Sequence, residues 1–575
     1  MIKLFKGMKK YKFQVVLVFV FTFMKVLAEL MLPTLMADIV NIGIRNEDIA
    51  FIMKTGVVML GIALAGTGSD ILKAYLSARV SMSFVTDLRR KLFTKVQSLS
   101  PGEFDETGTS SLITRTTNDV TQIQNLSIMG LRMMIRAPLM AIGGVIMAVS
   151  KNPGLSTLIL TVVLVLAALI GIVASITIPL FKKMQTKVDN LNRVLRERLT
   201  GIRVIRAFNR TAYERDRFTE ANGDLTDNAL KVNRIMASMF PMIILLMNFT
   251  TIAIVWRGAG SIDVGILEIG DMMAFIQYAT MILFALVMMT MMFTMIPRAS
   301  ASAVRINEIL DMETAITDPD DAKTPDEKRG LLEFRNVCFK YEGAEENALE
   351  NISFKAMPGE VTGIIGSTGS GKSTLINMIP RFFDPCDGSI FVDGTDIREM
   401  TQRDLRNRIG LVPQKAVLFT GSVRDNIIFG DKTIDEDRLM VSAAVSQSEE
   451  FIDTLSDGYN FQISQGGTNL SGGQKQRLSI ARALAGRKEI YIFDDSFSAL
   501  DFKTDAALRR ALKKDTEDST VIIVTQRVNT IMDADNIIVL EKGRLAGMGK
   551  HRELMKDNQV YRDIVLSQMS EEESA

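Results

Sequence analysis

Long apolar runs that end by Pro297 constrain the fold more than any other feature of this sequence. Residues 152–181, 235–256 and 272–297 contain no charged side chain. Each run exceeds the ~20 residues that a helix needs to cross ~30 Å of hydrocarbon. Three weaker runs are either shorter or interrupted by charges: 13–40, 55–69 and 137–150. The sequence therefore predicts six helices that cross a lipid bilayer.

The connections between these runs differ in charge. The first twelve residues carry five lysines, and residues 182–234 carry thirteen basic residues against seven acidic ones. The alternate connections hold few cations, so the positive-inside rule places both termini in the cytoplasm. Apolar residues at helical spacing within 182–234 predict that the spans continue as helices below the membrane. We expect a multi-pass protein of the cell membrane.

The pattern changes after residues 311–330, a polar and acidic stretch with two prolines that is expected to be a linker. From Leu331 onward, short apolar strands alternate with helical segments, which is typical of an α/β domain with a mainly parallel sheet. The expected strands are 360–366, 489–494 and 520–525. We thus predict a multidomain chain: an all-α transmembrane domain over 1–310, the linker over 311–330, and an α/β domain over 331–575.

A phosphate-binding motif lies at the start of this α/β domain. Gly366-Ser-Thr-Gly-Ser-Gly-Lys-Ser373 matches G-x-x-x-x-G-K-[ST], and it follows an expected strand and opens an expected helix. Its glycines let backbone amides wrap a phosphate, and the helix N-terminus adds positive potential. Lys372 is expected to reach the β and γ phosphates of ATP, and Ser373 to bind Mg²⁺. The nucleotide-binding residues predicted here are Gly366, Ser367, Thr368, Gly369, Ser370, Gly371, Lys372, Ser373 and Thr374.

A carboxylate follows a second apolar strand at residues 490–494. This strand ends in Asp494, the Walker B pattern in which an aspartate helps to hold the metal ion. ATP and Mg²⁺ are therefore the expected cofactors, and the cytoplasmic domain is expected to be the nucleotide-binding domain.

Charge and composition argue against other classes of protein. The net charge is +1, so no global field attracts nucleic acid, and no nucleic-acid partner is expected. The single histidine, His551, argues against a histidine-based metal site. The two cysteines, Cys338 and Cys386, cannot build a disulfide framework and fit a reducing compartment.

The motif Leu470-Ser-Gly-Gly-Gln-Lys-Gln-Arg477 gives the sequence its family resemblance. With it, the whole chain resembles the ATP-binding cassette family, and specifically the half-transporters that fuse a six-span exporter domain to a nucleotide-binding domain. The resemblance implies that this signature caps the γ-phosphate of a nucleotide held by a second subunit. The residues concerned are Ser471, Gly472, Gly473 and Gln474.

Other positions match landmarks of the family in order. The resemblance implies that Tyr341 stacks on adenine, and that Gln414 senses Mg²⁺ and contacts the membrane domain. It places the D-loop at residues 498–501, beside the dimer seam, and a loop that receives coupling helices at Gln465. The expected Mg²⁺ ligands are thus Ser373, Gln414 and Asp494. Coupling segments are expected near residues 104–110 and 211–217.

Two positions depart from the family pattern, and both belong to its chemistry. Asp495 stands where the family has a glutamate general base, and a retreat of ~1 Å from attack geometry can lower a rate by ~10²-fold. Gln526 stands where the family has a switch histidine, and glutamine cannot become cationic to stabilise transition-state charge. These two catalytic positions predict a site that binds ATP and hydrolyses it slowly. Tolerated variation in an active site is the alternative.

A weak catalytic half beside an intact signature predicts a heterodimer. A homologous exporter half that carries the family's Glu and His would form the active site, as in the degenerate-site subunits of bacterial multidrug exporters that this chain resembles. Two alternatives stay open: an ATP-gated regulatory or channel-like subunit with little turnover, and a homodimeric exporter of lipids or peptides.

The sequence gives two hints about what is carried. Eight methionines between Met272 and Met295 suit a surface that accepts several ligands, although packing in the span explains them equally well. Lys25 and Glu29, four residues apart in the first span, can neutralise each other, or Glu29 can contact a cationic substrate. Small hydrophobic or cationic substrates are expected. Asp70 and Lys73 are expected at or outside the edge of the hydrocarbon.

Overall fold

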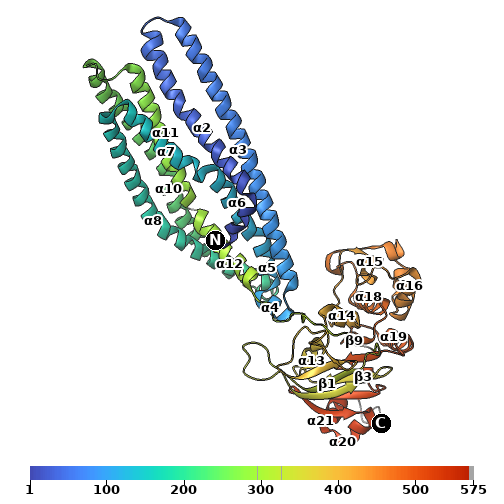
Figure 1. The fold of residues 1–575 in the computed structure, drawn as a ribbon. Helices are drawn as coiled ribbons and strands as arrows, with labels where there is room; N and C mark the ends of the chain where they lie inside the picture. The colour runs from blue at the N-terminus through green and yellow to red at the C-terminus, as the bar shows by residue number, and fades with distance from the viewer. Residues whose placement is uncertain (294, 326, 569–575) are drawn as a thin grey trace. The chain divides into compact units, whose positions relative to one another are not determined.

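The structure is a computed structural model that describes residues 1–293, 295–325 and 327–568. The chain divides into two compact units (Figure 1). Unit 1 comprises Met1–Gln97 and Thr109–Met312, and unit 2 comprises Ser98–Gly108 and the chain from Glu313 onward. Each unit is described by itself.

Unit 1 is helical throughout its regular elements. Its α-helices are α1 (Ile2–Phe5), α2 (Lys12–Asp38), α3 (Ile49–Ser98, whose last residue falls in unit 2), α5 (Thr109–Thr114), α6 (Val120–Met129), α7 (Arg136–Lys151), α8 (Pro153–Thr200), α9 (Ile202–Ala207), α10 (Thr211–Asp263), α11 (Ile269–Phe293) and α12 (Met295–Asp311). Short 3₁₀ or π turns join some of them: η1 (Lys6–Tyr11), η2 (Ile39–Ile44), η3 (Arg115–Asp119) and η4 (Gly130–Met134). Within the described residues, six helical segments are long and apolar enough to cross a membrane, which confirms the predicted number.

Two of these segments extend far beyond a bilayer. Helices α8 and α10 contain 48 and 53 residues, which at ~1.5 Å per residue gives ~70–80 Å each. They pack along each other. The side chain of Asn152 caps the start of α8 by accepting a hydrogen bond from Leu155 N at 2.9 Å, and Pro153 occupies the first turn. The expected helical rods over 182–234 are present, with breaks at Gly201 and at residues 208–210.

Helix α11 is central to the core of unit 1, where it packs on α7 and α2. Phe275 and Tyr278 are fully buried, and the Tyr278 hydroxyl donates to the Leu30 carbonyl at 2.8 Å. Two neighbouring methionines of this helix differ in exposure: Met272 packs partly buried against the core, whereas Met273 is exposed. The side chains of Met291 and Met292 lie outside the described residues.

Unit 2 contains the α/β fold. Its strands are β1 (Leu332–Phe339), β2 (Leu349–Ala356), β3 (Val361–Gly366), β4 (Asp387–Val392), β5 (Thr395–Asp396), β6 (Ile409–Val412), β7 (Gly421–Ser422), β8 (Gln462–Ile463), β9 (Ile490–Asp494), β10 (Thr520–Val524), β11 (Asn536–Glu541) and β12 (Arg544–Gly549). The main sheet has the order β12-β11-β3-β10-β9-β6 and is parallel except for β12. The three predicted strands are β3, β9 and β10, and the mainly parallel sheet is confirmed.

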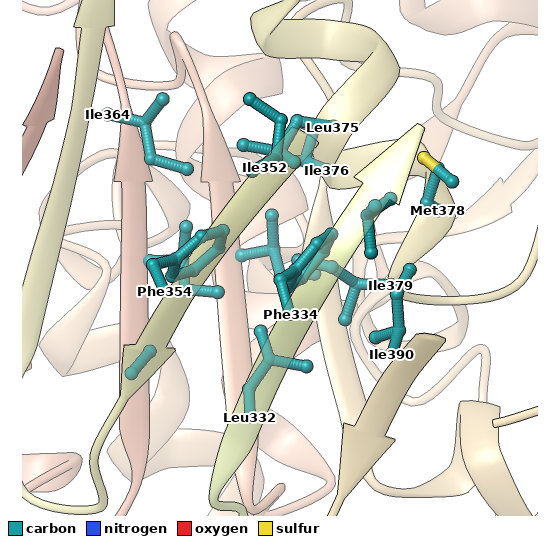
Figure 2. Packing of buried hydrophobic residues seen from close by; sticks show 14 of the residues in the cluster. Leu332, Phe334, Ile352, Phe354, Ile364, Leu375, Ile376, Met378, Ile379 and Ile390 are labelled. Atoms are coloured by element: carbon teal, nitrogen blue, oxygen red, sulfur yellow. The ribbon is translucent and has the colours of Figure 1, made fainter. Parts of the chain in front are cut away.

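A second sheet with the order β2-β1-β4-β5 is antiparallel, and the sequence did not predict it. Its inner face packs with α13 on the main sheet (Figure 2). Phe334 and Phe354 stack there with ring centroids 4.6 Å apart. Such aromatic pairs contribute ~0.5–1.5 kcal/mol beyond their burial. This core fixes β3 and the loop that follows it.

Most helices of unit 2 pack between the two sheets, on the opposite face of the main sheet, or in a separate helical lobe. They are α4 (Pro101–Thr107), α13 (Lys372–Met378), α14 (Gln402–Asn407), α15 (Val423–Ile427), α16 (Glu436–Val445), α17 (Glu449–Ile452), α18 (Gly472–Ala485), α19 (Phe502–Asp515), α20 (His551–Asp557) and α21 (Gln559–Leu566), with the 3₁₀ turns η5 (Gly458–Asn460), η6 (Gln465–Gly467) and η7 (Val528–Thr530). Helix α18 packs on α15 and α16 in that lobe. Because β3, β9 and β10 run parallel, their carboxyl ends meet at one edge, where ligands bind in such sheets.

Candidate nucleotide-binding site

The phosphate loop joins the end of β3 to the start of α13. Gly369 and Gly371 have φ of +80° and +98°, a region that glycine enters without strain. A Cβ on Gly371 would also lie 2.8 Å from Leu349 Cδ2, and one on Gly366 would lie 2.3 Å from the Leu540 carbonyl oxygen. The motif's glycines are thus required by the backbone itself.

Lys372 folds back over this loop. Its Nζ donates to the carbonyls of Gly366 and Ser367, both at 2.8 Å, and the side chain is nearly buried. Burial lowers the pKa of Lys372, while the charges of Asp494 and Asp495 oppose that shift. The Lys372 ammonium therefore has hydrogen-bond partners in the backbone and is stabilised electrostatically by two nearby carboxylates.

Asp494 ends β9 beside Asp495. Burial, and then the charge of Asp495, raises the pKa of Asp494 to about 6, against the opposing effect of Lys372. Two carboxylates share this place with one ammonium, so one negative charge is in excess. Such an excess suits a bound cation.

Asp495 has a backbone that is held at both ends. Its φ is +46°, its N–H donates to the Val524 carbonyl at 2.8 Å, and its carbonyl accepts from Ser498 Oγ at 2.8 Å. The Cα of Asp495, from which its side chain extends, is therefore fixed at the carboxyl edge of the sheet.

A cavity of about 580 Å³ brings the predicted residues of the site together. Its lining includes Tyr341, Thr368, Gly369, Ser370, Gly371, Lys372, Ser373, Thr374, Gln414, Asp494, Asp495 and Gln526. Gly366 and Ser367 are not part of the lining and instead hold Lys372. Sequence reasoning missed five lining residues that belong to no motif: Glu346, Asn347, Ala348, Lys542 and Gly543.

Tyr341 stands at the side of this cavity. Its hydroxyl lies 3.0 Å from Thr374 Oγ1, and its ring packs edge-on against Phe339 and Phe383. The side chain is 42% exposed. The ring thus keeps accessible surface on which a flat base could stack.

The signature segment lies elsewhere. Ser471 caps α18, because its Oγ accepts from Gln474 N at 3.3 Å and Gln474 Oε1 accepts from Ser471 N at 2.8 Å. A Cβ on Gly473 would lie 3.2 Å from the Ala499 carbonyl oxygen, which ties the helix start to the D-loop. All of these residues are described, and the lining of the cavity includes neither Ser471, Gly472, Gly473 nor Gln474.

Gln568, which no motif singles out, holds the loop that carries Gln526. Its Nε2 donates to the Gln526 carbonyl at 2.6 Å, and its Oε1 accepts from Val528 N at 3.0 Å. Between these two points, Arg527 Nη2 donates to the Ser498 carbonyl at 3.0 Å. One amide after α21 therefore fixes the backbone on both sides of Arg527.

The chain segment with α4 groups with unit 2 although it is distant in sequence. Glu103 Oε1 accepts from Ala315 N at 2.8 Å, and a Cβ on Gly102 would lie 3.7 Å from Phe383 Cε1. Phe383 also touches Tyr341. Residues from between two membrane helices thus sit one side chain away from the cavity.

The charged residues predicted in the first span have partners. Glu29 lies 3.2 Å from Lys25 Nζ, and its two oxygens accept from Arg136 Nη2 at 2.9 and 3.1 Å. Arg136 begins α7, so its approach could not be foreseen from the spacing of Lys25 and Glu29. The carboxylate is engaged by two cations.

Comparison with known proteins gives consistent matches over both units. The family model described as "ABC transporter transmembrane region" matches residues 15–287, and the model described as "ABC transporter" matches residues 349–498. An uncharacterized ABC transporter ATP-binding protein of Mycobacterium tuberculosis is 40% identical over 97% of each chain. The ATP-dependent lipid A-core flippase of Pseudomonas aeruginosa is 32% identical over 90% of this chain and 85% of that protein.

A solved structure shares the fold. It is described as a bacterial Atm1-family ABC exporter with ATP bound, and it matches with a TM-score of 0.79 over 98% of this chain and 99% of that chain at 24% identity.

Proposed function

The chain belongs to the ABC transporter family, and from that premise we propose that it is one half of a heterodimeric exporter. It moves hydrophobic or amphipathic compounds, several drugs among them, across the cell membrane at the expense of ATP. Its own ATP site is degenerate, and its signature completes the active site of a homologous partner. Both termini and the nucleotide-binding domain face the cytoplasm.

The observation that carries this proposal is the fixed backbone of Asp495. Its backbone N–H and C=O are both hydrogen-bonded, so the backbone cannot shift toward the nucleotide. The shorter aspartate side chain therefore stays one methylene short of the position that a glutamate carboxylate would reach. A general base must lie within hydrogen-bond reach of the proton it accepts. Gln526, which shares the cavity, can donate a hydrogen bond to a phosphate but cannot supply positive charge.

The rest of the cavity fits ATP with Mg²⁺. Ser373, Gln414 and Asp494 offer oxygen donors, which Mg²⁺ prefers, and Mg²⁺ sites commonly combine one or two carboxylates with substrate phosphates. When bound, Mg²⁺ neutralises charge that develops on the phosphates. The loop amides and Lys372 would hold the triphosphate, Tyr341 would receive the base, and Asp495 and Gln526 would lie on the side of the reacting phosphate.

Two segments are placed to couple nucleotide binding to the membrane helices. Segment 98–108 packs within unit 2, next to the side of the cavity that Tyr341 occupies. The start of α10 is braced by Arg217, whose Nη2 lies 2.7 Å from Glu197 Oε2 of α8. A bend that joins two long helices transmits motion to both. ATP binding would then shift the population toward a conformation in which the transport cavity between the spans opens outward.

The substrates are proposed at the level of hydrophobic or amphipathic compounds. The expectation of cationic substrates rested on Glu29, and that carboxylate is already paired with Lys25 and Arg136. Exposed methionines on α11, such as Met273, offer adaptable apolar surface.

The test is vanadate-sensitive ATPase activity of the purified chain, alone and with the half-transporter encoded beside it. We expect turnover only with the partner. In the complex, Asp495→Ala should cause a modest loss, whereas loss of the partner's general base should stop turnover. Asp495→Glu with Gln526→His should give the chain alone at least tenfold more activity.

Other outcomes identify the alternatives. Absence of turnover in both preparations would favour an ATP-gated regulatory subunit, for which Asp495 and Gln526 are the supporting observation. Full-speed hydrolysis by the chain alone would favour a homodimeric lipid or peptide exporter and would overturn the degenerate site. Uptake of dyes, lipids and peptides into inverted vesicles would then separate the substrate classes.

A further inference from the structure

Charged side chains from three separate helices gather in unit 1. They are Lys25 and Glu29 of α2, Asp70 and Lys73 of α3, and Arg132 of η4 with Arg136 of α7, and we call them the charged cluster. Within it, Glu29 pairs with Lys25 and Arg136, and Asp70 forms an ion pair with Lys73.

The group around Glu29 and the pair of Asp70 with Lys73 are neighbours in space. A Cβ on Gly66 would lie 3.8 Å from Lys25 Cδ, so the Lys25 stem runs beside α3 one turn from Asp70. Lys25 and Arg136 are close enough to act electrostatically on Asp70. Arg132 Nη2 donates to the Ala74 carbonyl at 3.1 Å, next to Lys73.

The charges of the cluster do not balance. Four cations face two carboxylates, which leaves a formal charge of +2. Lys73, whose side chain is 6% exposed, pairs with Asp70, whereas Lys25 and Arg136, which are 19% and 32% exposed, share the single carboxylate of Glu29. Buried charges in proteins are normally paired because an unpaired one is strongly unfavourable, and ionisable groups within membrane spans mark functional sites.

Two buried polar atoms of the cluster's surroundings also have no partner. Arg132 Nε is shielded from solvent without a hydrogen bond, and so is Ser77 Oγ, which lies one turn beyond Lys73 on α3. Ser77 is fully buried. Burial of a polar atom without a hydrogen bond is destabilising, so these atoms are suited to an additional acceptor.

We propose that the charged cluster binds the acidic headgroup, a phosphate or carboxylate, of an amphipathic substrate. The inference rests on the proposed export function and names the substrate class. Arginine and lysine are the side chains that bind such groups. The charge-free run 55–69 of α3 ends at Asp70, so an apolar tail can lie along the run while the headgroup meets the cluster. A cationic substrate would face a net positive charge.

The test measures binding to the complex of chain and partner in nanodiscs of phosphatidylcholine. The probes are a fluorescent acyl lysophosphatidic acid, the matching lysophosphatidylcholine, and an alkyltrimethylammonium of the same chain length. We expect the acyl phosphate to bind at least tenfold more tightly than the other two. Arg132→Gln should weaken its binding about tenfold, and Glu29→Gln should strengthen it severalfold because the net charge rises.

Arg45→Gln is the matched control. Arg45 pairs with Glu268 through exposed side chains outside the cluster, and its loss should leave binding unchanged. The gain expected for Glu29→Gln cannot arise from misfolding, so it keeps the test decisive if Arg132→Gln folds poorly.

Equal binding of the three probes, or weaker acyl phosphate binding in Glu29→Gln, would overturn the inference. If inorganic phosphate bound as tightly as the acyl phosphate, the proposal of an amphipathic ligand would be overturned, and the cluster would be a site for free anions. Failure of the export function looks different: the acyl phosphate would bind with the expected charge dependence, and no probe would be transported with ATP. Transport of the ammonium probe alone would sustain export and refute the acidic headgroup.

Discussion

Buried charges are arranged differently in the two units. In unit 2, Asp393 and Arg408 form an ion pair of 3.2 Å whose side chains are 1% and 6% exposed, and Asp393 also accepts from Leu331 N at 2.8 Å and Gly330 N at 3.2 Å. In unit 1, the charged cluster has two cations in excess, and its ion-paired side chains other than Lys73 are 19–44% exposed. The first arrangement is balanced and ties strands together, whereas the second leaves accessible positive charge that an external anion can meet. Charge balance thus separates structural from ligand-binding groups.

The nucleotide site also has unbalanced charge, but there the excess is negative. Asp494 and Asp495 lie in the field of Lys372, and the pKa of Asp494 is raised to about 6 by burial and by Asp495. Lys372 has hydrogen-bond partners in the loop, yet they are carbonyls and carry no net charge. An excess of negative charge suits Mg²⁺, and an excess of positive charge suits an acidic headgroup.

The largest effect is expected from the balanced pair. Asp393→Ala leaves the buried Arg408 uncompensated and should lower the free energy of unfolding of unit 2 by ~3–5 kcal/mol. Thermal unfolding of the purified chain measures it. Glu399→Ala is the control, because its pair with Lys323 is exposed and should contribute less than ~1 kcal/mol. Similar losses in both variants would contradict the comparison.

Lys372→Ala comes next. Loss of an ammonium that contacts phosphates should weaken ATP binding by ~10²-fold, since hydrogen bonds to charged groups contribute ~1.5–3 kcal/mol each. Equilibrium binding of a fluorescent ATP analogue measures the change. The exposed Lys513 at the end of α19 provides a control, and Lys513→Ala should bind like the wild type. Unchanged binding in Lys372→Ala would place the phosphates elsewhere.

The pH dependence of Mg²⁺-supported ATP binding should be about tenfold between pH 7 and pH 5. The pKa of Asp494 is raised from 3.8 to about 6, so the folded chain binds a proton there that the unfolded chain releases. Its contribution to stability therefore falls as pH rises from about 4 to about 6. Its ability to hold Mg²⁺ follows ionisation in the folded chain and improves between about pH 5 and pH 7. Titrations of wild type and Asp494→Asn with and without Mg²⁺ isolate this effect from the protonation of ATP itself. A wild-type profile identical to that of Asp494→Asn would refute it.

The smallest effect concerns a neutral contact. Gln568→Ala removes both hydrogen bonds to the loop of Gln526 and should lower turnover about fivefold in the Asp495→Glu, Gln526→His background, since a typical hydrogen bond contributes ~1 kcal/mol. ATP affinity should stay unchanged, because Gln568 holds backbone and touches no phosphate. Gln559→Ala, in α21 itself, loses exposed contacts with Asp563 and Arg562 and should retain activity. An equal decrease in both variants would assign the effect to α21 as a whole.

The sequence predicted the parts of the fold that depend on contiguous residues. Charge-free runs predict spans, because a helix needs a long, predominantly apolar run to cross hydrocarbon, and the phosphate loop is specified by eight consecutive residues. The antiparallel sheet was missed because its strands alternate weakly, with exposed bulges such as residues 335–336 within β1.

Side-chain sites assembled from distant segments could not be predicted in the same way. Spacing related Lys25 to Glu29, but Arg136 reaches them only through the packing of α7 on α2. Lys73 is buried beside Asp70, and its spacing from Asp70 alone does not show this. Gln568 bonds only backbone atoms of the loop, at Gln526 and Val528, and no sequence motif marks such a contact.

Helix α3 carries one further consequence. It is 50 residues long, contains no proline, and ends at Ser98, directly before α4. The long helices α2, α8 and α10 each contain an internal proline, where a helix can kink. A helix without a kink moves as one rigid body. In the proposed transport cycle, a displacement of the C-terminal end of α3 would therefore also move Lys73, which lies 25 residues or ~37 Å along the helix. That movement would separate Lys73 from the other cations of the charged cluster, so that one helix would serve both uptake and release of an acidic headgroup.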